Sequence, residues 1–265
     1  MKNDFILVLG AGGNIGGKIA HELLAAGATV AVAGRNRARL QQFENKATIL
    51  AGDFADDLFL QQAFENTTTL FLTVPDEHLA NPAATAARLG KLLQASRVKH
   101  IVNISNSIIA KAGAPTRLVA FEQELNKLAH VPILHLRCAN FYENLNWGLH
   151  TPYAPDLKLP YIASYEVARV AAYHLLSPGF TGKTVAVLLG PRDYSMAELA
   201  AAAGETYEQL PYTSANEHFY RPFNEGDFEV EERTSDNTSQ LRDARFTLEY
   251  FLENDLVRQP LSTDQ

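Results

Sequence analysis

Three glycines that could form a ligand-binding loop, Gly10, Gly13 and Gly16, follow the first apolar run of the chain and lead into a stretch of helix-forming residues. A glycine at such a turn adopts backbone angles that side chains forbid, and it lets a pyrophosphate reach the free N–H groups at the positive end of the helix. The spacing is G-x-x-G-x-x-G, so Ile15 stands where the usual fingerprint has its last glycine. The context still predicts a dinucleotide site, with a purely structural turn as the alternative. The loop residues expected to bind the cofactor are Gly10, Ala11, Gly13, Asn14, Ile15 and Gly16.

The segment after the second apolar run indicates which dinucleotide is preferred. NAD enzymes usually place a carboxylate there to bind the ribose 2′-hydroxyl. This chain instead reads Gly34-Arg35-Asn36-Arg37-Ala38-Arg39, without a carboxylate. A charge-assisted hydrogen bond to a phosphate is worth roughly 1.5–3 kcal/mol. Arg35 and Asn36 therefore favour NADP(H), with NAD(H) as the weaker alternative. Three exposed arginines at a helix start are the competing interpretation, although cations there are unfavourable unless they meet an anion.

Other catalytic patterns are absent from the sequence. It contains neither the G-x-S-x-G elbow of serine hydrolases nor the H-E-x-x-H pair of zinc proteases, and its eight histidines are scattered. We expect no metal site. The single cysteine, Cys138, cannot form an intramolecular disulfide and follows an apolar run. A packed apolar role is expected for it rather than a nucleophilic one.

Short runs rich in Val, Ile and Leu alternate with Ala- and Leu-rich segments over about residues 5–137. This alternation is typical of βαβ units and a parallel sheet covered on both faces. Gly27 stands where the first helix should stop, and Asn36 should cap the helix beginning at Arg37. We expect an α/β, Rossmann-type doubly wound parallel sheet. The predicted strands are Phe5–Leu9, Thr29–Ala33, Thr48–Leu50, Thr69–Val74, His100–Ile104 and Ile133–Leu136.

The pattern changes after residue 137, which predicts a second, smaller α+β lobe on the substrate side. Residues 1–137 are assigned to the NAD(P)-binding domain, with 165–190 returning to its sheet. Residues 138–164 and 191–265 are assigned to the cap. Within these stretches, 138–164 reads as irregular and 205–240 as mixed. The predicted later elements are helices over Tyr165–Leu176, Met196–Ala203 and Gln240–Glu253 and a strand over Thr184–Leu189.

The composition excludes several classes of protein. Asp plus Glu number 30 against 23 Lys plus Arg, a net charge of −7, so the basic footprint of a nucleic-acid binder is missing. The first apolar run is too short for a secretory signal, and no window approaches the roughly 20 apolar residues of a membrane span. We expect a cytoplasmic protein without membrane contact. The acidic run Glu225–Glu232 is expected to be solvated, with a protein partner as the alternative.

Several motifs together resemble the atypical short-chain dehydrogenases/reductases. They are the loop GAGGNIG, Gly34-Arg35-Asn36, Gly52-Asp53 and Val102-Asn103-Ile104-Ser105. Two later stretches are similar to the NmrA-like branch, which includes NADPH-dependent quinone reductases and redox-sensing regulators. They are Leu136–Asn144, similar to "LRPxxFxEN", and Tyr161–Arg169, followed by Gly182-Lys183 and Leu189-Gly190-Pro191. The resemblance covers about residues 4–203.

The resemblance implies roles for individual residues. Asp53 and Phe54 match the pair that borders the adenine, although loop capping is an equal alternative for Asp53. Thr73, Val74 and Pro75 match the loop along the ribose and nicotinamide, and Ser105 matches the serine beside the nicotinamide; an ordinary strand end is the alternative for both. Residues matching the substrate wall are Phe141, Tyr142 and Asn144, and nearby Trp147 could line an aromatic pocket or a small core.

The chain departs from the wider family at its catalytic pair. No tyrosine is followed by a lysine four residues later, and no tyrosine occurs between Ser105 and Arg137, where the pair belongs. An ordinary ketone yields a strongly basic alkoxide and needs a positioned acid. A quinone yields a phenol-like oxyanion with a pKa near 10, which needs less help. The catalytic residues are therefore unknown, and quinone-like or conjugated carbonyl acceptors are favoured.

Three functions follow from these patterns. The first is an NADPH-dependent reductase acting on a small quinone-like acceptor. The second is a non-catalytic regulator that senses NADP(H) and acts through a protein partner. The third, an isomerase or epimerase, is disfavoured by the missing Tyr/Lys pair. The oligomeric state is left open by the sequence, with a homo-oligomer as one alternative.

Overall fold

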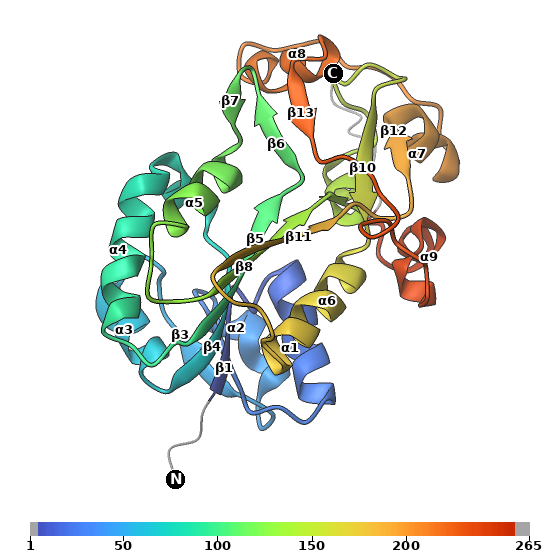
Figure 1. Cartoon of the computed structure of the whole chain (residues 1–265). Helices are drawn as coiled ribbons and strands as arrows, with labels where there is room; N and C mark the ends of the chain where they lie inside the picture. Colours follow the sequence, from blue (N-terminus) through green and yellow to red (C-terminus); the bar gives the residue numbers. More distant parts are fainter. Residues whose placement is uncertain (1–4, 258–265) are drawn as a thin grey trace. The chain divides into compact units, whose positions relative to one another are not determined.

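The computed structural model describes residues 5–257, and the ends of both predicted lobes, 1–4 and 258–265, lie outside the described residues. The chain forms two compact units. The first contains residues up to 106, 116–137 and 167–186; the second contains 107–115, 138–166 and the residues from 187 onward. Each unit is described separately, with the labels of Figure 1.

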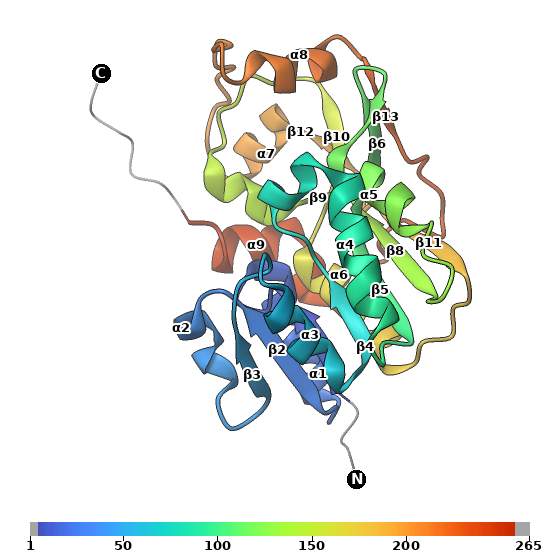
Figure 2. The same cartoon turned by 90° about the vertical axis from the view of Figure 1, so that its left-hand side faces the viewer.

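A seven-stranded sheet forms the centre of the first unit, in the order β11-β8-β5-β4-β1-β2-β3 (Figure 2). The β1–β2, β2–β3, β1–β4 and β4–β5 pairs are parallel. The strand order reverses at β1, which lies between β4 and β2 and is therefore the topological switch point of the sheet. The strands are β1 (Phe5–Leu9), β2 (Val30–Gly34), β3 (Thr48–Ala51), β4 (Thr67–Leu72), β5 (His100–Asn106), β8 (Ile133–Cys138) and β11 (Lys183–Leu188).

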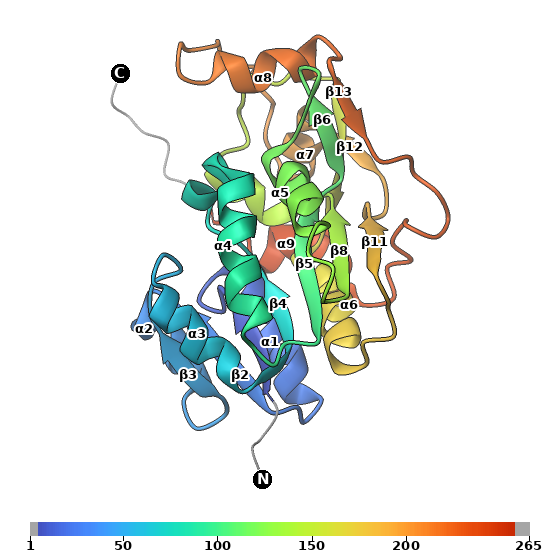
Figure 3. The same cartoon turned by 60° about the vertical axis from the view of Figure 1, so that its left-hand side comes forward.

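Helices cover both faces of this sheet, as its buried strands require. Helices α3, α4 and α5 lie on one face, and α1 and α6 lie on the other (Figure 3). The core between the sheet and the first group contains Leu7, Leu70, Leu89 and Phe121, all fully buried. The helices are α1 (Asn14–Ala25), α2 (Arg37–Leu40), α3 (Asp57–Glu65), α4 (Pro82–Gln94), α5 (Arg117–Leu125) and α6 (Ser164–Leu176).

The predicted Rossmann-type sheet is confirmed. The predicted helix start at Asn36 and the predicted helix end at Gly27 are confirmed as well. The Asn36 side chain caps α2 by accepting hydrogen bonds from the N–H groups of Ala38 and Arg39, at 3.0 and 3.4 Å. Gly27 ends α1 with a φ of +78°. Strand β4 begins two residues before its predicted start and ends at Leu72, so Thr73 and the residues after it belong to a loop rather than to the strand.

The second unit contains two three-stranded sheets, ordered β12-β10-β9 and β13-β6-β7. Its core is rich in aromatic side chains, with Tyr142, Tyr161, Tyr194, Phe223 and Phe251 among the buried members. The elements are β6 (Ile108–Lys111), β7 (Ala114–Pro115), β9 (Asn140–Phe141), η3 (Tyr142–Trp147), β10 (Lys158–Ile162), β12 (Asp193–Ser195), α7 (Met196–Ala202), α8 (Glu217–Asn224), β13 (Phe228–Val230), η4 (Ala244–Phe246) and α9 (Leu248–Asn254).

Two expectations for this part of the chain, those for residues 138–164 and for the start of the last helix, are wrong. Residues 138–164 are not irregular, because β9 and β10 pair in parallel there. The mixed stretch 205–240 contains α8 and β13, and β13 pairs with β6, which is over 100 residues earlier. The last helix begins at Leu248 rather than Gln240, because the Asp243 and Thr247 side chains cap two separate helical turns.

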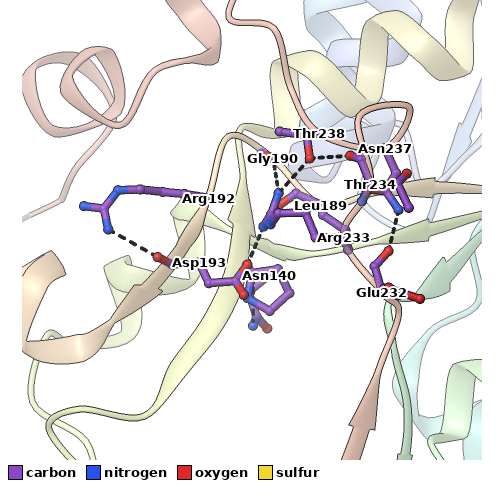
Figure 4. A network of polar contacts seen from close by, with 11 residues as sticks. Asn140, Leu189, Gly190, Arg192, Asp193, Glu232, Arg233, Thr234, Asn237 and Thr238 are labelled. Carbon is purple, nitrogen blue, oxygen red and sulfur yellow. Dashed lines mark hydrogen bonds and ion pairs between the residues drawn. The ribbon is translucent and has the colours of Figure 1, made fainter.

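Arg233 ties the segment after β11 to the chain that follows β13 (Figure 4). Its guanidinium donates to the carbonyl oxygens of Gly190 and Leu189, at 2.7 and 3.1 Å, and pairs with the Asp193 carboxylate. These bonds hold Gly190 with a φ of +71° against β10, where an added Cβ would lie 1.9 Å from the Tyr161 carbonyl oxygen. The position thus needs glycine for both its conformation and the space around it.

No helix within residues 5–257 is long and apolar enough to cross a membrane.

Replacing Gly190 with alanine should destabilise the fold far more than replacing Gly204. Both residues have a positive φ, at +71° and +81°, but nothing lies within 4 Å of a Cβ at Gly204. The left-handed backbone costs alanine about 1–2 kcal/mol at either site, and overpacking adds about 1–3 kcal/mol at Gly190. Thermal unfolding of both variants measures the difference. Equal losses of Tm would show that the contact with Tyr161 is relieved without cost.

Candidate functional site

The turn between β1 and α1 brings backbone very close to backbone. Gly10 has a φ of +68°, and an added Cβ at Gly16 would lie only 2.4 Å from the Gly10 carbonyl oxygen. The Gly13 N–H closes the turn by donating to the same oxygen at 2.9 Å. Gly13 is also the N-cap residue of α1 and has no side chain to cover its end. The first N–H groups of the helix are therefore available to an anion.

A pocket of about 420 Å³ opens beside this turn. Its lining comes from the carboxyl ends of β1, β2, β3 and β4 and from the loops that follow them. This is the edge of a doubly wound sheet where ligands bind, at the switch point of the strand order. The lining residues are Leu9, Gly10, Gly12, Gly13, Ile15, Ala33, Gly34, Arg35, Asn36, Arg39, Gly52, Phe54, Phe59, Leu60, Thr73, Val74 and Pro75.

Nine residues named from the sequence lie in this lining: Gly10, Gly13, Ile15, Arg35, Asn36, Phe54, Thr73, Val74 and Pro75. The structure places the remaining candidates in other surroundings. Ala11 is fully buried, and its N–H donates to the Ala33 carbonyl at 3.0 Å. Asn14 is exposed and accepts a hydrogen bond from Lys18. Asp53 is exposed and caps its own loop, because its Oδ1 accepts the Ala55 N–H at 2.8 Å.

Aromatic rings form the apolar wall of the pocket. Phe54 is 7% exposed, with the His78 ring 4.9 Å from its centroid and the Arg88 guanidinium 5.1 Å from it. Phe59 and Leu60 were not named from the sequence. Gly52 is the sequence signal closest to Phe59, because an added Cβ at Gly52 would lie 2.3 Å from the Phe59 ring; no such signal identifies Leu60. A flat base can stack on such a wall.

The polar rim of the pocket is basic. Arg35, Asn36 and Arg39 are exposed and line the pocket together at the start of α2. Arg39 was not named as a cofactor residue from the sequence. It packs close to the glycine loop, because an added Cβ at Gly12 would lie 3.2 Å from the Cβ of Arg39. The Arg35 guanidinium lies 2.9 Å from the Glu77 carboxylate, which follows β4. This rim concentrates positive charge where a phosphate could bind.

Ser105 is buried rather than in the lining of this pocket, and its hydroxyl donates to the Glu122 carboxylate at 2.6 Å. Glu122 is itself buried and forms an ion pair with Arg137 at 2.5 Å. Burial raises the pKa of Glu122, but hydrogen bonds from Arg137 and Ser105 outweigh that effect and hold the pKa below its usual value. A charged carboxylate thus occupies the helix that would carry a Tyr/Lys pair.

A buried histidine lies beside this ion pair. In its neutral form His135 accepts from the Asn103 amide at Nδ1, at 3.1 Å, and donates from Nε2 to the Asn126 amide oxygen, at 3.0 Å. Burial lowers its pKa to about 4, against the opposing charge of Glu122. A second proton would put two donors face to face with Asn103, so the neutral ring is the form that the fold accommodates.

The residues matching the substrate wall lie in the second unit. Phe141 and Asn144 are partly exposed, and Trp147 is 83% exposed at the end of η3. Tyr142 is fully buried, with the rings of Tyr194 and Phe251 at 6.2 and 6.0 Å. Its ring therefore belongs to the core of this unit and anchors the segment. Cys138 is also buried, which raises the pKa of its thiol well above the usual range and agrees with a packing role.

Residues 10–131 match the protein family described as NAD(P)H-binding. Across the sheet and the pocket, the chain therefore has the architecture of an NAD(P)H-binding, Rossmann-type protein. A comparison with curated protein sequences gives no significant match. Groups of His, Cys, Asp and Glu that could hold a metal ion are not found within the described residues.

Solved structures extend the likeness to most of the chain. An NADPH-dependent quinone oxidoreductase of Escherichia coli, complexed with NADPH, is 22% identical, with a TM-score of 0.67 over 80% of each chain. The negative transcriptional regulator NmrA, in complex with NAD, is 14% identical, with a TM-score of 0.74 over 97% of this chain and 96% of that one. A nucleoside-diphosphate-sugar epimerase of Staphylococcus aureus is 19% identical, with a TM-score of 0.76 over 94% and 99%.

The NAD(P)H-binding match over residues 10–131 and the fold shared with these structures agree with the fold that the motif resemblance implies. A dinucleotide also fits the features of this chain: glycines where backbone approaches closely, an open helix N-terminus and an aromatic wall.

Replacing Gly13 with alanine should weaken dinucleotide binding without unfolding the protein. The residue has extended backbone angles that alanine adopts, and the new methyl group would lie at the end of α1, where a pyrophosphate approaches. Loss of that approach should raise the Kd for NADPH about ten-fold or more. Gly17→Ala is the matched control, because its Cβ would also lie 3.3 Å from a backbone carbonyl but outside the pocket lining. Similar affinities for both variants in calorimetric titration would contradict the site.

The buried His135 should make stability depend on pH. Its folded-state pKa of about 4 lies below the ordinary value of 6.5, so the unfolded chain binds more protons between these values. Stability should therefore fall as the pH decreases from 6.5 towards 4, by about 1.4 kcal/mol per pH unit.

Urea unfolding between pH 7 and 5 measures this slope. The variant His135→Gln should remove most of it, whereas His130→Gln, at an exposed position, should keep it. An unchanged slope in His135→Gln would assign the dependence to other groups.

Proposed function

We propose that the protein binds NADP(H) in preference to NAD(H) and reduces a small quinone-like or conjugated carbonyl acceptor. The observation that carries the proposal is the combination of two features of the first unit. The pocket at the switch point has Arg35 in its lining, and the stretch between Ser105 and Arg137, where the Tyr/Lys pair is expected, has no tyrosine and instead contains the buried Glu122, paired with Arg137. The first feature favours a phosphorylated dinucleotide, and the second disfavours reactions that need a strong general acid.

Each wall of the pocket suits one part of the cofactor. The glycine loop and the N-terminus of α1 would receive the pyrophosphate, and Phe54 would border the adenine. Arg35, Asn36 and Arg39 would surround the 2′-phosphate, because guanidinium groups bind phosphates with paired hydrogen bonds. The loop Thr73–Pro75 would continue along the ribose towards the nicotinamide, and Asp53 would hold its loop in place through the hydrogen bond to Ala55.

The protein's own groups limit which acceptor can react. A bound nicotinamide would supply the hydride. Ser105 cannot act as a free proton donor, because its hydrogen is directed to the ionised Glu122 carboxylate. A quinone-like acceptor yields an oxyanion whose conjugate acid has a pKa near 10, so the anion can form without a positioned acid and take its proton from solvent later, whereas a simple ketone yields a strongly basic alkoxide that needs a proton donor as it forms. This chemistry supports quinones and conjugated carbonyls over simple ketones.

The acceptor side is proposed to use the segment that follows β8. Phe141, Asn144 and Trp147 are partly or largely exposed and would contact a flat acceptor, and Tyr142, buried in the core of the second unit, would anchor the segment. An aromatic side chain with exposed faces suits stacking on a planar ring.

A regulator that senses NADP(H) is the second candidate. The observation that favours it is the missing Tyr/Lys pair, since a binding protein needs no proton donor. The fold shared with NmrA, a negative transcriptional regulator seen in complex with NAD and with NADP, is compatible with it. Its partner would be a protein, and the acidic stretch near β13 is the candidate contact.

NADPH oxidation against a panel of quinones, enones and simple ketones separates these functions. We expect turnover with quinones and conjugated carbonyls, weak or no turnover with simple ketones, and lower activity with NADH as the control donor. Calorimetry should show NADPH binding in the same preparation. Binding without turnover across the panel would contradict the reductase and favour the sensor, and a failure to bind either dinucleotide would exclude both.

A further inference from the structure

The arginine at the rim of the pocket is already part of an ion pair. Nη1 of Arg35 lies 2.9 Å from Oε1 of Glu77, and the two side chains are 60% and 52% exposed. Arg35 directly follows β2, whereas Glu77 belongs to the 3-10 helix η2 (Asp76–Ala80) after β4. Pro75, two residues before Glu77, lines the pocket. The ion pair therefore joins the segment after β2 to the segment after β4, both of which contribute residues to the pocket lining.

The backbone around Glu77 is firmly held. The next residue, His78, packs its ring 4.9 Å from Phe54, and its carbonyl accepts the Thr85 hydroxyl at 2.7 Å. Leu79 is 2% exposed in the core. Glu77 can thus change its rotamer while its backbone stays close to the lining residue Pro75. A ligand group that binds Nη1 of Arg35 must compete with the Glu77 carboxylate 2.9 Å away.

Resting on the NADP(H) site proposed above, we propose that Glu77 sets the dinucleotide preference by competing with the 2′-phosphate for Arg35. An exposed ion pair is held weakly, so a phosphate with more charge and more acceptor oxygens can displace it. Displacing the Glu77 carboxylate from Arg35 still costs free energy, and this cost lowers the affinity for NADP(H). The 2′-hydroxyl of NAD(H) does not require the ion pair to break. It can donate a hydrogen bond to the Glu77 carboxylate, as it does to the acidic residue of NAD enzymes.

Glu77 thereby supplies, from the segment after β4, the carboxylate that is missing after β2. In this proposal the Arg35 guanidinium binds the 2′-phosphate of NADP(H), and the Glu77 carboxylate accepts a hydrogen bond from the 2′-hydroxyl of NAD(H). The expected result is a protein that binds both dinucleotides, with a preference for NADP(H) that is smaller than Arg35 alone would produce.

Titration calorimetry of the full-length protein at low ionic strength tests this with NADPH and NADH. Glu77→Gln should lower the Kd for NADPH about three- to five-fold, the size expected for an exposed ion pair. The Kd for NADH should not fall and should rise if its 2′-hydroxyl uses the carboxylate. Asp76→Asn is the matched control, because it removes the same charge from an exposed neighbour on the same 3-10 helix. It should change both Kd values by less than about two-fold.

A double variant shows whether Glu77 acts through Arg35. In an Arg35→Ala background, Glu77→Gln should change the Kd for NADPH by less than about two-fold. The guanidinium for which the carboxylate and the phosphate compete is then absent. An undiminished gain in that background, an equal gain for both dinucleotides, or no change at all would overturn the competition. A protein that binds neither dinucleotide would refute the proposed site itself, whereas binding that is insensitive to Glu77 refutes only this inference.

Discussion

The close approach of two backbone segments at the start of α1 is the constraint on which the site depends. Gly16 lies against the Gly10 carbonyl at a distance that excludes a Cβ, and a methyl group at Gly10 would collide with Thr73. These contacts bring the end of β1, the first turn of α1 and the loop after β4 together. The pocket exists because these three parts meet at the switch point of the sheet. Its floor is therefore made of backbone, and its specificity must come from side chains on the rim.

The rim and the interior of the first unit use charge in different ways. Arg35 and Glu77 are exposed, so their pairing is weak and can be exchanged for a ligand. Glu122 and Arg137 are largely buried, where removing one partner would leave an uncompensated charge. The buried pair is thus a fixed part of the fold that engages Ser105, whereas the exposed pair can respond to what binds. For this reason the exposed pair is where we propose that the dinucleotide is selected.

The proposed reductase and the proposed regulator would use the same dinucleotide site. Binding a dinucleotide requires the glycine turn, the aromatic wall and the basic rim, all of which lie in the first unit. Turnover requires in addition an acceptor that can accept a hydride without a strong acid nearby. In the proposed reductase, the ionised Glu122 carboxylate holds the Ser105 hydroxyl, so the acceptor would be limited to one whose reduced oxygen needs no strong acid.

The sequence by itself determined the parallel sheet, the glycine turn and the capping of α2, because these depend on short-range patterns of apolar residues, on Gly10 and on Asn36. It could not show that Ser105 is engaged by Glu122, that Glu77 faces Arg35 or that Phe59 joins the pocket wall, since each contact joins segments distant in the chain. The strand β13 was missed for the same reason, because its partner β6 precedes it by more than 100 residues. Local conformational propensities depend on neighbouring residues and can be read from the sequence, whereas contacts between segments distant in the chain are decided only by tertiary packing.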